Sequence, residues 1–312
     1  MAVATKKIVK KILATIGEAK LNGSSTIGNR IPVVKTYKLY IDGKFVRSES
    51  GRYMQINNKE NFGANICRAS RKDIRDAVVV ARKAQSDWSK KTAYNKGQIL
   101  YRIGEMLEGR RAQLIHTMML DGATETQSTN EINNAVDCFI YFAGWSDKYI
   151  QMFSSVNPVE SAHFNFSYPE PTGVVTAICP DESPLFALAN IIAPVIVGGN
   201  TIVVLSSQQY SRTACELAEV LHSSDVSGGV VNILNGSKKE LISNLASHKD
   251  VNAMIYVGTT GDENKIIETN CAINVKRAIK LSATESNSNA GLHPYRIMST
   301  QEIKTTWHPV GL

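Results

Sequence analysis

The sequence predicts an α/β protein with a doubly wound parallel sheet, and three observations lead to this class. Short runs rich in β-branched residues alternate with helical segments over residues 173–280, which is the pattern of a parallel sheet covered on both faces. Amphipathic helical periodicity precedes this region. The 312 residues are 43% hydrophobic and 20% charged, a composition that supports a sizeable globular core.

Residues 1–34 predict a basic amphipathic arm followed by a polar linker. Apolar residues recur there at helical spacing with lysines between them: Ile8, Val9, Ile12, Leu13 and Ile16, and Lys6, Lys7, Lys10 and Lys11. The pattern leaves three interpretations open, namely an organellar transit peptide, a helix that docks on a surface or a partner, and a solvated helix with no specific role. We expect a cytoplasmic protein, with a mitochondrial location as the alternative that this helix raises.

The next segments predict a hairpin, a group of helices and an arm. Residues 38–45 read as a hairpin because Asp42-Gly43 favours a type I′ turn. Amphipathic blocks then predict helices that share a core: 71–89, 98–119 and 130–153. Residues 162–171 alternate apolar and polar side chains before a proline, which predicts an extended strand or arm.

The region from Gly173 onward predicts the parallel sheet itself. The buried strands are expected at 173–179, 200–205, 229–234 and 253–257. The helices between them are expected at 185–197, 213–222 and 237–247. Sheets of this kind bind nucleotides in the crevice at the carboxyl ends of their strands.

Charge and residue counts exclude several classes of function. The net charge is +7, but residues 1–60 hold 12 basic and 4 acidic side chains, so the remainder is nearly neutral and no nucleic-acid partner is expected. No window is apolar enough for a membrane-spanning helix. The five cysteines show no CxxC spacing and the six histidines no HxxxH or HxH pair, so we expect neither a disulfide framework nor a metal site.

Several sequence blocks resemble the aldehyde dehydrogenase superfamily in order and spacing. They are GVVTAICPDESPL from Gly173, GNTIVV from Gly199, GVVNILNG from Gly229, DV from Asp250 and YVGT from Tyr256. The resemblance covers residues 35–312, and the CPDESPL, DVNAMIYVG and KTTWHPVG blocks are most similar to the second, incomplete module of the family-sixteen aldehyde dehydrogenases. It implies an aldehyde-dehydrogenase-like Rossmann-type sheet with N-terminal helices, and no catalytic domain.

The resemblance also implies a division of the chain. A nucleotide-binding domain is expected over residues 35–287, and residues 157–171 within it would form the oligomerisation hairpin. Residues 288–312 are expected to be a C-terminal tail that lies over the domain surface. A protein partner or a homo-oligomer is therefore expected.

The family's catalytic positions are filled by unsuitable residues. Glu182 stands where the family places the asparagine that stabilises an oxyanion, and an ionised carboxylate does the reverse. Residues 279–284 match the segment that carries the general base, and no acid occurs before Glu285. The family's nucleophilic cysteine lies beyond the matched region, and Cys179 is expected to be a buried thiol at a strand end. We therefore expect no catalytic residue.

The cofactor positions are also altered. Leu205 and Gln208 replace the lysine and glutamate that hold the NAD ribose in the family. Gly258 and Thr259 match the turn that approaches the pyrophosphate and are the vestigial cofactor-binding residues. Asp262-Glu263 would place negative charge beside those phosphates. No bound cofactor is expected, although a vestigial NAD site remains an interpretation.

These substitutions predict a catalytically inactive aldehyde-dehydrogenase-like protein, a pseudoenzyme with a structural, scaffolding or assembly role in a larger complex. Two alternatives stay open. One is an NAD-binding regulatory module. The other is the non-catalytic part of an NAD(P)-dependent aldehyde dehydrogenase whose active site lies on another chain.

Overall fold

A computed structural model of the chain describes residues 34–56 and 63–311. The predicted N-terminal arm, apart from Val34, lies outside the described residues. Residues from Lys35 onward form one compact unit. Among the residues that are described, no helix is both long and apolar enough to span a bilayer.

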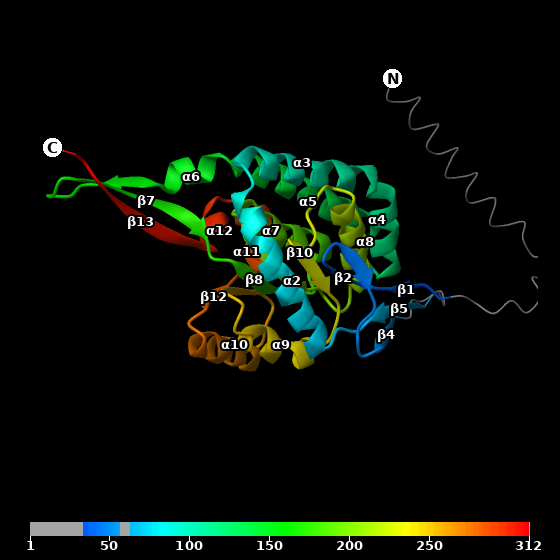
Figure 1. Cartoon of the computed structure of the whole chain (residues 1–312). Coiled ribbons are helices and arrows are strands. Elements are labelled where there is room, and N and C mark those ends of the chain that lie inside the picture. Colours follow the sequence, from blue (N-terminus) through cyan, green and yellow to red (C-terminus); the bar gives the residue numbers. More distant parts are fainter. Residues whose placement is uncertain (1–33, 57–62, 312) are drawn as a thin grey trace, which may run out of the picture. The chain divides into compact units, whose positions relative to one another are not determined.

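The central feature is a seven-stranded sheet in the order β12-β11-β8-β9-β10-β2-β3 (Figure 1). Five of its strands run parallel: β8 (Val174–Ile178), β9 (Thr201–Leu205), β10 (Val231–Leu234), β11 (Ala253–Tyr256) and β12 (Arg277–Lys280). From β8 the chain first adds β9 and β10 on one side of the sheet and then adds β11 and β12 on the other side. This is the doubly wound order of nucleotide-binding folds. The predicted fold class is confirmed.

An antiparallel hairpin extends this sheet at the β10 side. It consists of β2 (Leu39–Ile41) and β3 (Lys44–Val46). Asp42 and Gly43 connect them with φ of 57° and 68°, as a type I′ turn requires. The hairpin predicted from the Asp-Gly pair is thus present.

Helices cover both faces of the sheet. On one face lie α2 (Arg71–Lys90), α9 (Lys238–Ser247) and α10 (Gly261–Ile273), and on the other lie α7 (Pro184–Val197) and α8 (Ser211–His222) with the long helices above them. Those long helices are α3 (Ala93–Gly109), α4 (Arg111–Leu120) and α5 (Glu125–Trp145), followed by the short α6 (Lys148–Phe153). Alternate strand residues, such as Val174 and Val175, enter the two separate hydrophobic cores. The block expected at 98–119 is divided into two helices at Arg110.

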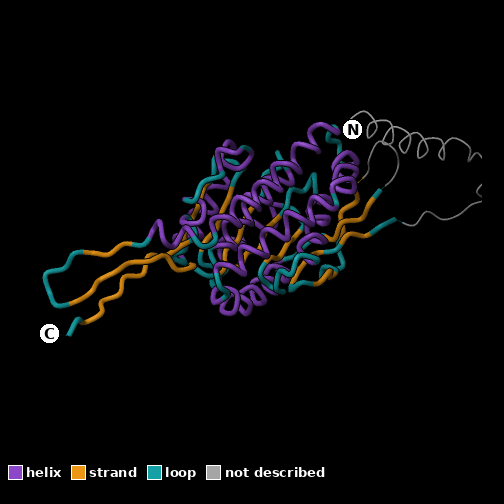
Figure 2. Tube along the Cα trace, turned by 90° about the horizontal axis from the view of Figure 1, so that it is seen from above, coloured by secondary structure: helices purple, strands orange, loops and turns teal. Residues whose placement is uncertain are grey.

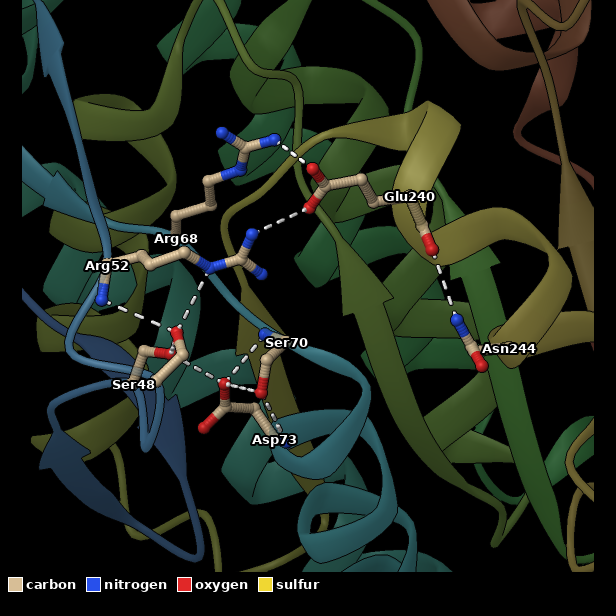
Figure 3. A network of polar contacts seen from close by, with 8 residues as sticks. Ser48, Arg52, Arg68, Ser70, Asp73, Glu240 and Asn244 are labelled. Atoms are coloured by element: carbon tan, nitrogen blue, oxygen red, sulfur yellow. Dashed lines mark hydrogen bonds and ion pairs between the residues drawn. The ribbon is translucent and has the colours of Figure 1, made fainter.

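A polar network fastens a small sheet to the helices of one face (Figure 3). The sheet contains β1 (Thr36–Tyr37), β4 (Tyr53–Ile56) and β5 (Ala64–Cys67). Ser70 caps α2 in a capping box: its hydroxyl accepts from the Asp73 amide at 3.4 Å, and the Asp73 carboxylate accepts from the Ser70 amide at 2.7 Å. The same carboxylate accepts a bond from the Ser48 hydroxyl at 2.7 Å. Arg52 and Arg68 both pair with Glu240 of α9.

A separate three-stranded sheet extends away from the helices (Figure 2). Its order is β13-β7-β6, and both pairings are antiparallel. The strands are β6 (Ser155–Asn157), β7 (His163–Pro171) and β13 (Gln301–Pro309). The strand expected at 162–171 is therefore found, and it belongs to a hairpin with β6.

The C-terminal segment differs from the surface tail that the sequence suggested at 288–312. It contains the turn η1 (Asn289–Gly291), the short helix α12 (Tyr295–Met298) and β13, and it comes after α11 (Ala283–Asn287). All nine residues of β13 pair with β7. The tail interpretation missed this strand because its pairing partners lie 130 to 146 positions earlier in the chain, where no local pattern points to them.

Candidate functional site

The candidate site is the crevice at the carboxyl ends of the parallel strands. The strand order reverses between β8 and β11, and ligands of open α/β sheets bind at such a switch point. The loops after the strands enclose a cavity of about 250 Å³. Its lining is polar and consists of Asp181, Ser206, Ser207, Gln208, Gly236, Ser237, Lys238, Lys239 and Glu263. The volume is below the ~300–1,000 Å³ that is common for ligand pockets.

Gly258 and Thr259, the predicted cofactor residues, lie at the end of β11 beside this cavity. Gly258 has a φ of +62°, and a Cβ there would come within 3.2 Å of the Pro180 Cβ. Only glycine combines that conformation with that close approach at no steric cost. The Gly258 carbonyl accepts a bond from the Lys238 ammonium at 3.2 Å, and the Thr259 hydroxyl donates to Asn264. Both residues are thus engaged within the chain.

The N-terminus of α10 comes directly after this turn, and two acidic residues of α10 itself lie at that end of the helix. Thr260 and Glu263 form a capping box, in which the Thr260 amide donates to the Glu263 carboxylate at 2.8 Å. Asp262 lies in the same first turn. Two carboxylates already complement the positive end of the helix dipole, so a phosphate placed there would meet repulsion.

Leu205 and Gln208, which the resemblance aligns with ribose contacts, lie in different environments. Leu205 is 1% exposed and belongs to the hydrophobic core between the sheet and α2. Gln208 is exposed and lines the cavity. The hydroxyls of Ser206 and Ser207 donate within the chain, to Asn235 at 2.6 Å and to Asp181 at 2.7 Å. The hydroxyls of Ser206 and Ser207 are therefore engaged within the chain, whereas Gln208 faces the cavity.

The N-terminus of α7 holds an acid that sequence analysis missed. Glu131 of α5 accepts hydrogen bonds from the backbone amides of Leu185 at 3.1 Å and Phe186 at 2.9 Å. Burial raises the pKa of Glu131, and these amides oppose the shift. Glu182, which the resemblance predicts at the oxyanion position, lies exposed on the preceding turn. Glu131 occupies amides that an anion would otherwise contact, and no local pattern could have paired residues 54 positions apart.

The segment that matches the general base has a structural role. Leu281 is buried, and Ser282 caps α11. The Glu285 carboxylate accepts bonds from the Ser282 amide at 2.9 Å and hydroxyl at 2.7 Å, and these bonds lower the pKa of Glu285. Glu285 is committed to this cap.

The cysteines are all free and buried. Burial raises the pKa of the thiols of Cys138, Cys179 and Cys271, and that of Cys215 to about 12. Cys179 is a strand-end thiol next to Pro180, as expected. Within residues 34–56 and 63–311, no group of three or more histidine, cysteine or acidic side chains is arranged to hold a metal ion.

Comparison with known proteins identifies relatives in one family. The family model described as "Aldehyde dehydrogenase family" matches residues 45–286. Human mitochondrial 10-formyltetrahydrofolate dehydrogenase is 32% identical over 286 residues, which are 87% of this chain and 30% of that protein. An aldehyde dehydrogenase of Aspergillus niger is 28% identical, over 81% of this chain and 51% of that protein.

Solved structures agree with this result. A Bacillus cereus aldehyde dehydrogenase in complex with NAD+ matches with a TM-score of 0.75 and 25% identity, over 80% of this chain and 51% of that one. PnpE from Pseudomonas sp. WBC-3 matches with the same TM-score, 28% identity and the same coverage. The chain thus spans about half the length of these structures and less than a third of the human relative.

Proposed function

Since this chain belongs to the aldehyde dehydrogenase family, we propose that it is a catalytically inactive member whose role is assembly, and that the sheet β6–β7–β13 is its assembly surface. The exposed apolar side chains of that sheet are the observation that carries the proposal. The partner that fits the surface best is a second copy of the chain.

The crevice supports the first half of the proposal. Covalent oxidation of an aldehyde needs an activated thiolate, a base and oxyanion donors. The described thiols are buried, the aligned base segment ends in the Glu285 cap, and Glu131 already accepts the amides at the start of α7. Glu285 and Glu131 thus make structural contacts, and none of the described thiols is exposed.

One face of the three-stranded sheet carries a row of aromatic rings. Phe164, Phe166 and Tyr168 alternate along β7, with ring centroids 5.6 and 6.0 Å apart. Val156 of β6 pairs with Phe166 and therefore lies on the same face. Phe164 is 48% exposed and Val156 is 68% exposed, so this face, here called the aromatic face, presents apolar surface to its surroundings.

The opposite face is mixed. Asn157 donates to Asn165 at 2.6 Å and to Ser167 at 2.8 Å, and Ser167 contacts Thr305. Trp307 lies on this face and is 58% exposed. The single polar face expected from the alternation in β7 is therefore supplemented by apolar residues from β13.

The strand edges add a second means of association. Within the part of the chain that the structure describes, β6 and β13 each pair on one side only. Unpaired edges recruit further strands unless they are protected. A twofold axis that stacks two copies face to face would cover both aromatic faces, whereas a twofold axis at a strand edge would pair two identical edges.

Charge substitutions on the aromatic face test the proposal. Phe164→Glu combined with Phe166→Glu should lower the mass measured by multi-angle light scattering toward that of a monomer, because like charges would face one another across the interface. His163→Glu, on the same strand but the opposite face, is the matched control and should keep the wild-type mass. A wild-type protein that is already monomeric, or a double variant with unchanged mass, would refute it.

One observation favours a second candidate, a nucleotide-binding regulatory module. The cavity at the strand ends lies at the switch point and includes the ammonium groups of Lys238 and Lys239. Calorimetric titration with NAD decides between the two: micromolar affinity supports the regulatory module, and no heat below millimolar concentration supports the assembly role.

A further inference from the structure

Arg296 is a buried cation that has no counter-ion among the described residues. It lies in α12, and the residue is 3% exposed. Its Nη2 donates to the backbone carbonyl of Asn190 at 3.1 Å. Its Nε and Nη1 are buried and have no hydrogen-bond partner. These two nitrogens carry three of the five guanidinium donors.

Unpaired donors of this kind are rare because their desolvation is costly. Burying a charged group is unfavourable unless it is paired and hydrogen-bonded. Burial lowers the pKa of Arg296 to about 10, which reflects that cost. A guanidinium nevertheless stays protonated near neutral pH, so the positive charge is present in the folded chain.

The neighbouring groups do not neutralise Arg296. Glu285 is the acid whose charge acts most on Arg296, but its carboxylate is held by the amide and hydroxyl of Ser282 and forms no ion pair with Arg296 within 4.0 Å. Cys138 is the second such group, and burial raises the pKa of its thiol so that it stays neutral.

A second unsatisfied group lies three residues before Arg296. The Nδ1 atom of His293 is buried without a partner. Burial and the charge of Arg296 both lower the pKa of His293, so its ring is neutral and can carry its proton on Nδ1 as a donor. On the α7 side, the Asn190 side chain donates to the Glu285 carbonyl at 2.7 Å, and its own Oδ1 is buried without a hydrogen-bond partner.

We propose that Arg296 and His293 hold a small monovalent anion, of chloride or formate size, between α7 and the segment 283–298. The donors are those of an anion site, and the surroundings are crowded, since a Cβ on Gly291 would collide with the Glu285 carbonyl. Because these neighbouring atoms lie close together, the proposal is limited to a small anion. The anion would supply the counter-charge that the chain itself does not.

The position of this site gives it a structural consequence. Segment 283–298 joins the end of β12 to β13 through three short elements, α11, η1 and α12. Short helices contribute little stability of their own. An anion bound by Arg296 would hold this connection on α7 and so support the start of the three-stranded sheet.

Thermal unfolding in chloride and in gluconate at equal ionic strength tests the proposal, because gluconate is too large to enter. Chloride should stabilise the wild type in a saturable way, lowering the unfolding equilibrium constant about a hundredfold at 100 times its dissociation constant. Arg296→Met should lose this dependence. Arg75→Met, which removes an exposed guanidinium paired with Asp76, is the matched control and should keep it. Equal stability of the wild type in both salts would overturn the proposal.

A crystallographic experiment covers the case in which Arg296→Met does not fold. Wild-type crystals soaked in bromide should show an anomalous peak within hydrogen-bond distance of Arg296. Displacement of that peak by formate would indicate a carboxylate as the ligand, and its persistence would indicate a halide. Solvent density at Arg296 without an anomalous peak would mean that water alone satisfies the donors, and the proposal would be wrong.

Discussion

Glu131 fastens the start of α7 to α5 through the backbone amides of Leu185 and Phe186. Glu131→Ala should destabilise the chain by about 1–3 kcal/mol for each amide that loses its acceptor. Glu131→Gln keeps one acceptor oxygen and should cost less. Urea unfolding measures both, with Asn130→Ala, at an exposed neighbouring position of the same helix, as the control. Equal stabilities of the Ala and Gln variants would contradict this role.

The charge of Glu131 also makes a pH dependence predictable. Its pKa in the folded chain is raised above 4.5, chiefly by burial. A group with a raised folded pKa contributes stability below its unfolded pKa and loses that contribution as the pH rises through the folded value. The free energy of unfolding of the wild type, relative to Glu131→Gln, should therefore fall as the pH rises above about 4.5. A difference that grows with pH would show the opposite sign.

The thiols provide a further prediction at the scale of single residues. All five cysteines are buried, and burial raises the pKa of four of them. Because the thiolate is the reactive form, a chromogenic disulfide reagent should label none of them in the native protein and all five after denaturation. One thiol that reacts rapidly before unfolding would indicate an activated cysteine and would weaken the inactive assignment.

At the scale of secondary-structure elements, the acids at the N-terminus of α10 should lower the affinity of the crevice for an anion. Asp262 and Glu263 lie in its first turn. Asp262→Asn with Glu263→Gln removes both charges and retains a capping box, because glutamine also serves at that position. Each charge near a helix end is worth about 0.3–1 kcal/mol.

We therefore expect wild-type protein to give no calorimetric signal with NAD below millimolar concentration, and the double variant to bind NAD or phosphate several-fold more tightly. Lys239→Gln is the control. It removes a positive charge from the lining of the same cavity and should therefore not improve the binding of an anion. An unchanged affinity in the double variant would show that steric restriction, rather than repulsion, limits the crevice.

At the scale of the whole molecule, the chain should not oxidise aldehydes with NAD. Glu285, which follows the aligned base segment, caps α11, Glu131 accepts the amides at the start of α7, and the thiols are buried. Purified protein should give no aldehyde-dependent NADH absorbance. A variant with all five cysteines replaced by serine is the control for contaminating enzyme. Activity that persists through purification in the wild type and disappears in that variant would refute the assembly proposal.

Local sequence patterns were sufficient for much of this fold. The β-branched runs from Gly173 and the Asp42-Gly43 turn predicted the parallel strands and the hairpin, because side-chain periodicity and backbone φ preferences act over a few residues. The order and spacing of the sequence blocks predicted the family. The sequence alone also put Leu205 where the family resemblance implies a ribose contact, and that assignment stays a prediction.

Only the tertiary structure decided how distant segments meet. The pairing of β13 with β7, the capping of α7 by Glu131 and the unpaired guanidinium of Arg296 each depend on residues that are about 50 to 140 positions apart or on what surrounds a buried side chain. Such contacts form because chain segments bury apolar surface together and then must satisfy the polar groups enclosed with it. No local pattern records which groups will be enclosed.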